Sequence, residues 1–115
     1  MDGFRLDVIN NVTLDDAFLD NPFDENGEQR HLHDVNQKGI HEFMRRLKDH
    51  FDGEDPVFLV GEISSDDLDV IASYAGEGQL DTTFNFNLGS QPDFCFERFF
   101  GELSKMTARY DGDCY

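Results

Sequence analysis

Tryptophan is absent from this sequence, and basic residues are scarce: 9 Lys and Arg stand against 25 Asp and Glu, giving a formal net charge of −16. Such a charge repels nucleic acid phosphates and anionic lipid surfaces, so neither is expected as a partner. The chain also has no apolar run of transmembrane length. Its first residues lack the basic and apolar regions of a signal peptide, and we therefore expect a cytoplasmic protein.

Cysteine is almost as scarce, and Cys95 and Cys114 lie far apart, outside any CxxC or Cys/His cluster. This spacing favours reduced structural thiols over a disulfide. The four histidines lack the carboxylate pattern of a metal site, and the aspartates between residues 15 and 25 lack the EF-hand spacing of calcium ligands. We accordingly expect neither a metal ion nor another cofactor.

Twelve phenylalanines predict buried aromatic structure despite the high charge. A chain of 115 residues is long enough for one modest domain, residues 1–115. Within it, the segment 10–36 is rich in Asp, Asn and Gly and has little periodicity. Because this acidic segment is too long for a simple connector, we expect a functional loop or a small subdomain there.

The rest of the sequence alternates between strand-like and helix-like patterns. Apolar residues predict strands at 4–9, 57–60 and 80–88. Helices are predicted at 40–51, from a cap at Ser64 or Ser65 to Gly76 or Gly78, and after Pro92. The last helix should bury an apolar stripe that comprises Phe96, Phe99, Phe100, Leu103, Met106 and Tyr110. Three consecutive βα units predict a parallel α/β sheet or part of a (β/α) barrel.

Arg5, Asp7 and Glu62 are the candidate functional residues. Arg5 and Asp7 are two positions apart on the first predicted strand, and Glu62 follows the second strand. Catalytic groups of barrel enzymes lie at the carboxyl ends of strands, and two carboxylates about 5 Å apart would suit a retaining glycosidase. The residue types alone leave a plainer alternative open, in which Arg5 and Asp7 form an ordinary ion pair and Glu62 is a surface acid.

The residues around these candidates form longer motifs. The run Gly3–Asn10, Gly-Phe-Arg-Leu-Asp-Val-Ile-Asn, resembles the fourth-strand motif of family 13 glycoside hydrolases, the α-amylase superfamily. The segment Phe58–Glu62 resembles the fifth-strand motif, residues 39–44 resemble the intervening helix, and residues 80–86 resemble strand six. The resemblance implies a partial (β/α)8 TIM barrel of about three βα units, corresponding to strands four to six.

The same resemblance assigns roles to the candidates. It implies that Asp7 is the catalytic nucleophile, that Arg5 helps hold it ionised, and that Glu62 is the acid/base, in a less charge-stabilised setting. Val8, with the two serines beyond Glu62, is similar to the branch that includes oligo-1,6-glucosidase, dextran glucosidase and trehalose-6-phosphate hydrolase. The implied function is hydrolysis of α-glucosidic bonds in short oligosaccharides through a covalent glucosyl-enzyme. A sucrose phosphorylase-like glucosyl transferase is an alternative.

Two motifs of the resembled family are missing from the sequence: the Asp-x-x-x-x-Asn-His segment near strand three and the His-Asp pair after strand seven. The third catalytic carboxylate is therefore absent, and we expect an internal fragment of an enzyme. A noncatalytic carbohydrate-binding or interaction module derived from the same fold is the alternative. Three strands cut from a closed barrel would leave two unpaired edges, so self-association is also expected.

The isolated chain is predicted to have no α-glucosidase activity, because two of three catalytic carboxylates cannot supply the full transition-state environment. A hydrolysis assay with nitrophenyl α-glucoside tests this. Turnover by the unmutated chain that disappears in Glu62→Gln would contradict the prediction.

Overall fold

The computed structural model describes residues 2–53, 56–76 and 78–110, so the prediction for Cys114 falls outside the described residues. The described residues form eight short elements in this order: β1 (Gly3–Leu6), η1 (Ile9–Asn11), α1 (Ile40–Phe51), β2 (Phe58–Gly61), α2 (Leu68–Ala72), β3 (Thr82–Thr83), α3 (Phe86–Gly89) and α4 (Phe96–Thr107). Among the described residues, no helix is long and apolar enough to cross a membrane.

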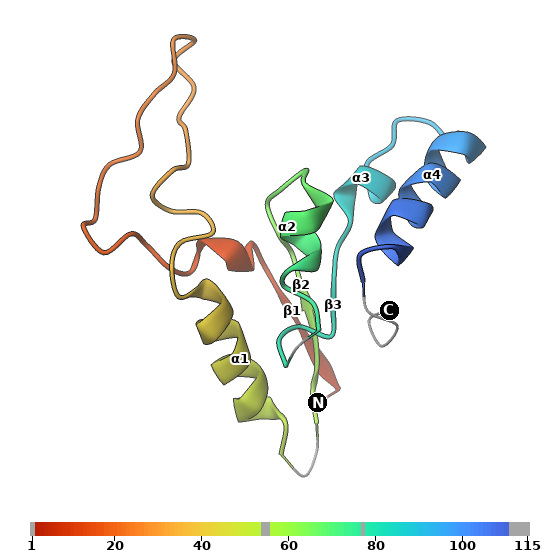
Figure 1. The fold of residues 1–115 in the computed structure, drawn as a ribbon, viewed down its shortest axis with the longest axis horizontal. Coiled ribbons are helices and arrows are strands. Elements are labelled where there is room, and N and C mark those ends of the chain that lie inside the picture. The colour runs from red at the N-terminus through yellow and green to blue at the C-terminus, as the bar shows by residue number, and fades with distance from the viewer. Residues whose placement is uncertain (1, 54–55, 77, 111–115) are drawn as a thin grey trace.

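The three strands form one parallel sheet in the order β1-β2-β3. The connection from β1 to β2 contains α1, and the connection from β2 to β3 contains α2. Helix α1 lies on one side of the strands, and α3 and α4, which follow β3, lie on the other (Figure 1). Parallel neighbours require such crossovers, because consecutive parallel strands start at the same edge. The predicted parallel α/β architecture is confirmed.

The core lies between β2 and the helices α1 and α2. It is built from apolar side chains that are almost fully buried, among them Met44, Leu59, Ile63, Ile71 and Leu80. Helix α1 has the predicted bounds and turns Ile40 and Met44 into this core. Its Lys48 binds both carboxylate oxygens of Asp81 at 2.9 Å, and Asp81 also accepts the Leu59 backbone N–H at 2.7 Å. This ion pair ties α1 to the start of β3.

Residues 12–39 leave the body of the molecule as a long protruding loop (Figure 1). The loop contains one antiparallel bridge, between Phe23 and Gln29, and otherwise consists of turns and extended segments. Asp24 accepts backbone N–H groups of Asn26 and Glu28 and so closes the turn at this bridge. The loop is held by such local hydrogen bonds, since large apolar side chains such as Phe18 and Phe23 remain exposed.

The first predicted strand is too long. Regular pairing stops at Leu6, and Val8 adopts the left-handed conformation with φ 40° and ψ 48°. Ile9 then begins η1 and is buried in the core. The apolar alternation of Phe4–Ile9 therefore does not mark a strand along its whole length. The chain turns sharply at Val8, and Ile9 enters the core from beyond that turn.

The predictions for the C-terminal half also need correction. The strand expected at 80–88 is only Thr82–Thr83, because Asn85 accepts the Leu88 N–H and starts α3. Helix α2 is capped by Asp67, whose carboxylate accepts the Asp69 N–H, and not by Ser64 or Ser65; it ends at Ala72 rather than at Gly76 or Gly78.

The apolar stripe predicted on the last helix is real but poorly covered. No residue of α4 is fully buried, and Phe96 is 60% exposed. Phe96 instead packs against Phe100, with ring centroids 4.3 Å apart, while Met106 contacts the edge of the core. The prediction that all these side chains enter the core is wrong, because among the described residues too few elements pack against this face of α4.

Gly61 is predicted to tolerate no larger residue. A Cβ there would overlap Leu80 Cδ1 and approach Ile9 Cγ2 to 3.3 Å, and both side chains are buried. We expect Gly61→Ala to lower the free energy of unfolding by about 1–3 kcal/mol, as overpacking does. The matched control is Gly101→Ala in α4, where a Cβ meets nothing within 4 Å; it should raise stability by about 0.5–1 kcal/mol. Denaturant unfolding of both variants tests this, and equal effects would contradict it.

Candidate active site

The two candidate carboxylates follow neighbouring strand ends. Leu6 pairs with Gly61 in the sheet, so Asp7 and Glu62 are the first residues beyond β1 and β2. The pairing continues past the strands, because the Glu62 N–H donates to Leu6 O at 2.8 Å and the Ile9 N–H donates to Glu62 O at 2.9 Å. These bonds hold the backbone of Glu62 against the turn that carries Asp7.

Arg5 joins the two carboxylates. Its Nη2 atom lies 2.9 Å from Asp7 Oδ1 and also contacts Glu62 Oε2. Two oxygens that contact one nitrogen lie within about 6 Å of each other, since a hydrogen bond spans about 3 Å. The structure thus brings together all three residues that the sequence singled out.

The two carboxylate side chains differ in how exposed they are, but both contact Arg5. The Asp7 side chain is 72% exposed, whereas that of Glu62 is 20% exposed. The expectation that Glu62 has the less charge-stabilised setting is therefore wrong in this geometry, because Arg5 contacts it as well. The ordinary Arg5–Asp7 ion pair does exist, but Glu62 is not the freely exposed surface acid of that alternative.

A third strand end supplies an aromatic side chain that the sequence argument missed. Phe84 follows β3, and its N–H donates to Gly61 O at 2.9 Å. The Arg5 guanidinium carbon lies 5.7 Å from the centre of the Phe84 ring, which is a cation–π distance. The Phe86 ring stacks on the Phe84 ring, with ring centroids 6.1 Å apart. Such a contact contributes about 0.5–1 kcal/mol at an exposed site and orients the guanidinium.

Asn10 was also missed as a functional candidate, although it lies within the strand-four motif. Its side chain is completely buried, and its amide makes two bonds with the backbone of Ser64: Oδ1 accepts the N–H at 3.0 Å and Nδ2 donates to the carbonyl at 3.3 Å. Nδ2 also donates to Asn36 Oδ1 at 3.2 Å. A buried amide with these partners links the turn after β1 to the turn after β2.

Tyr74 joins this hydrogen-bond network through Asn36. Its hydroxyl donates to Asn36 Oδ1 at 2.6 Å, and its ring lies 4.8 Å from the His41 ring. Burial raises the pKa of Tyr74 to about 12, because the phenolate would lose its hydration. The end of the long loop at Asn36 is thereby attached to the same core that holds the strand ends.

The histidines occupy separate sites. His33 pairs with Asp15 at 3.1 Å, His31 pairs with Asp34 at 2.9 Å, and His41 Nδ1 lies 2.9 Å from Gln79 Oε1. The Ala17 N–H, followed by other loop groups that include His33, keeps the pKa of Asp15 below its usual range. Within 2–53, 56–76 and 78–110, no three His, Cys, Asp or Glu side chains form a metal-binding group.

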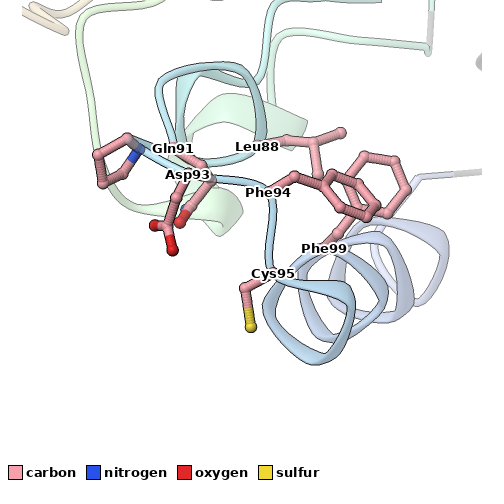
Figure 2. Close-up of a pocket in the computed structure, with 7 residues that line it drawn as sticks. Leu88, Gln91, Asp93, Phe94, Cys95 and Phe99 are labelled. Atoms are coloured by element: carbon pink, nitrogen blue, oxygen red, sulfur yellow. The ribbon is translucent and has the colours of Figure 1, made fainter.

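A pocket of about 280 Å³ lies away from the carboxylates, where α3 leads into α4. Figure 2 shows Phe94 and Phe99 on one side of it and Asp93 and Cys95 along the connecting loop. Neither Asp7 nor Glu62 lines this pocket. We therefore place the candidate active site at the strand ends, where charged groups converge, and not in the pocket.

Comparison with known proteins identifies the family of the chain. The family model for the alpha amylase catalytic domain matches residues 1–106, which include every strand and Arg5, Asp7 and Glu62. The chain belongs to this family. The resemblance to this family thus extends over nearly the whole chain.

Individual relatives point to the same part of the family. Trehalose-6-phosphate hydrolase of Bacillus subtilis is 34% identical over 89 residues, which is 76% of this chain and 15% of that protein. Among solved structures, the alpha-glucosyl transfer enzyme XgtA superposes with a TM-score of 0.79 at 28% identity, covering 96% of this chain and 23% of that one. Trehalose-6-phosphate hydrolase of Bacillus licheniformis gives 0.68 at 29% identity, covering 92% and 20%. The chain therefore spans less than a quarter of the length of each of these relatives.

The buried hydroxyl of Tyr74 predicts a pH dependence of stability. An unfolded tyrosine has a pKa of about 10, whereas Tyr74 in the folded chain has one of about 12. Its contribution is complete below about pH 10 and is lost as the pH rises toward about 12, because the unfolded chain releases the proton first. We expect the free energy of unfolding to fall by on the order of 1 kcal/mol between about pH 8 and pH 11.

Tyr74→Phe is the control, because it removes this titration while Lys48 and the other ionisable groups remain. The variant should be less stable by about 1 kcal/mol near neutral pH, since it loses the bond to Asn36, and its stability should decline less at high pH. Denaturant unfolding at several pH values gives both quantities. Parallel pH curves for the two proteins would contradict the prediction.

Proposed function

We propose that this chain is the part of a retaining glycoside hydrolase that carries the nucleophile and the acid/base, and that the parent enzyme hydrolyses α-glucosidic bonds in short oligosaccharides. One observation carries the proposal: a single Arg5 nitrogen contacts both Asp7 and Glu62 where they leave neighbouring parallel strands. Carboxyl groups in retaining enzymes are about 5–5.5 Å apart, whereas inverting enzymes need about 6.5–9.5 Å to admit a water. The bridge by Arg5 favours the shorter separation.

In the proposed first step, Asp7 attacks the anomeric carbon while Glu62 gives its proton to the glycosidic oxygen. The bond to the leaving group breaks, and a glucosyl ester forms on Asp7. In the second step Glu62 takes a proton from water, whose oxygen displaces the carboxylate of Asp7. Asp7 is the more exposed carboxylate and Glu62 the more enclosed one.

Arg5 has to change partners during this cycle. While Glu62 is ionised, Arg5 is attracted to both carboxylates. Once Glu62 carries its proton, that attraction weakens and the Arg5 charge remains with Asp7. The Phe84 ring below the guanidinium limits where Arg5 can move. Arg5 would then orient the nucleophile without taking part in bond making.

The proposed placement in the barrel and the substrate class rest on the relatives. We assign β1, β2 and β3 to strands four to six of a (β/α)8 barrel, because the carboxylates follow the first two in the family's order. Two of the named relatives are trehalose-6-phosphate hydrolases. We therefore infer that the parent enzyme acts on a short α-glucoside, with glucose or a glucose derivative as leaving group.

Glucosyl transfer is a second candidate function. The alpha-glucosyl transfer enzyme XgtA has a TM-score of 0.79 with this chain, above that of the trehalose-6-phosphate hydrolase structure at 0.68. Both reactions share the glucosyl-enzyme and differ in the acceptor of the second step. Product analysis in the presence of phosphate or a sugar acceptor separates them, since transfer yields a new glucoside and hydrolysis yields free glucose.

The roles of the carboxylates are testable in the full-length protein that carries this segment. Asp7→Asn should abolish the covalent glucosyl-enzyme, because an amide cannot act as the nucleophile. Glu62→Gln should slow hydrolysis of an unactivated disaccharide by about 10²–10⁴-fold, yet it should still form the intermediate from glucosyl fluoride, which leaves without much protonation. Azide should restore turnover in Glu62→Gln by attacking without general-base help.

Asp16→Asn and Glu25→Gln are matched controls, because both side chains are exposed on the loop. They should leave turnover unchanged. Mass spectrometry of the trapped intermediate gives the decisive result: a glucosyl label on any residue other than Asp7 removes it as the nucleophile. Full activity of Glu62→Gln on the disaccharide removes Glu62 as acid/base, and no label at all favours a noncatalytic module.

A further inference from the structure

We infer that Asn10 is a positioning residue for the proposed reaction: its buried side chain fixes the spacing between the turn that carries Asp7 and the turn that carries Glu62. The inference rests on the proposed function. Asn10 lies three residues after Asp7, and its partner Ser64 lies two residues after Glu62. The two bonds between them therefore join the chain just beyond both carboxylates.

The Asn10 amide continues the sheet where backbone pairing has ended. Past β1 and β2, the backbone supplies the bonds from Glu62 N–H to Leu6 O and from Ile9 N–H to Glu62 O. At the next position, the side chain of Asn10 offers one acceptor and one donor to the Ser64 backbone, as a neighbouring strand would. An asparagine has both groups on one planar amide, whereas aspartate has acceptors only.

A second observation shows why the hydrogen bonds between Asn10 and Ser64 are needed. Val8 adopts a left-handed conformation that β-branched residues rarely take, and it stands directly after Asp7. Such backbone persists only where the surroundings over-determine it. The Ile9 bond to Glu62 and the Asn10 bonds to Ser64 and Asn36 lie directly after Val8 and supply that constraint. Without them, the turn can relax and carry Asp7 away from Glu62.

Tyr74 contacts the same hydrogen-bond network only through Asn36 among the described residues. It donates to Asn36 Oδ1 and has no bond to Asn10 or Ser64 among those of the described residues. Removing the Tyr74 hydroxyl should therefore weaken the hydrogen-bond network around Asn36 without breaking the bonds between Asn10 and Ser64. This distinguishes an effect on carboxylate spacing from a general loss of stability.

The test measures kcat and KM for full-length protein carrying Asn10→Asp, with the active fraction counted from the burst of covalent intermediate. We expect kcat per active site to fall by about 10²-fold, the loss that a misplacement of about 1 Å can cause, with KM changed by less than about threefold. Asn10→Ser, which is too short to reach both Ser64 groups, should behave alike and serves if Asn10→Asp does not fold. Asn26→Asp, the same substitution on the exposed loop turn, and Tyr74→Phe should keep kcat.

Three results would overturn the inference. Unchanged kcat per active site in both Asn10 variants would do so, as would an equal loss of kcat in Tyr74→Phe. A fall in the active fraction alone would show that Asn10 serves folding and not spacing. The proposed function fails separately, namely when Asp7→Asn and Glu62→Gln retain activity whatever the Asn10 variants do.

Discussion

Parallel pairing of β1 with β2, in the register Leu6 opposite Gly61, is the constraint on which the rest of the structure depends. It sets the two carboxylates at the same edge of the sheet, at the ends of neighbouring strands about 5 Å apart. Gly61 permits the close approach because Leu80 and Ile9 fill the space that a side chain would need. A shift of one residue in this register would turn Arg5 to the other face and separate it from Glu62.

Charge in this molecule is arranged unevenly around that edge. The chain carries a large negative net charge, yet a single arginine contacts both candidate catalytic carboxylates. Phe84 lies beneath the guanidinium, so an apolar ring limits its hydration on one side. Asn36, near the end of the long loop, bonds to Asn10 and Tyr74. The loop's own carboxylates are used locally, for turns at Asp15 and Asp24.

Much of the architecture was predictable because strong local patterns coincide with the observed elements. Helix α1 has its apolar residues at helical spacing, and β2 is a short apolar run bounded by turn residues, so both were placed correctly. The predictions failed where side-chain hydrogen bonds override hydrophobic pattern. Asn85 starts a helix inside an expected strand, and Asp67 takes the capping role expected of Ser64 or Ser65. The exposed face of α4 could not be foreseen, since periodicity shows that a stripe exists but not what covers it.

The sequence by itself determined the family and the candidate residues, because the motifs around Asp7 and Glu62 combine residue types and order that local chemistry alone does not require. Tertiary structure alone decided how those residues meet. Arg5 and Glu62 are 57 positions apart, and Asn10 and Ser64 are 54 apart, so no local pattern encodes their contacts. The left-handed turn at Val8 is likewise followed by a hydrogen bond to a residue distant in sequence, from the Ile9 N–H to Glu62 O. Spacing between groups on different strands is set by sheet register and buried polar bonds, which form only when the chain has folded.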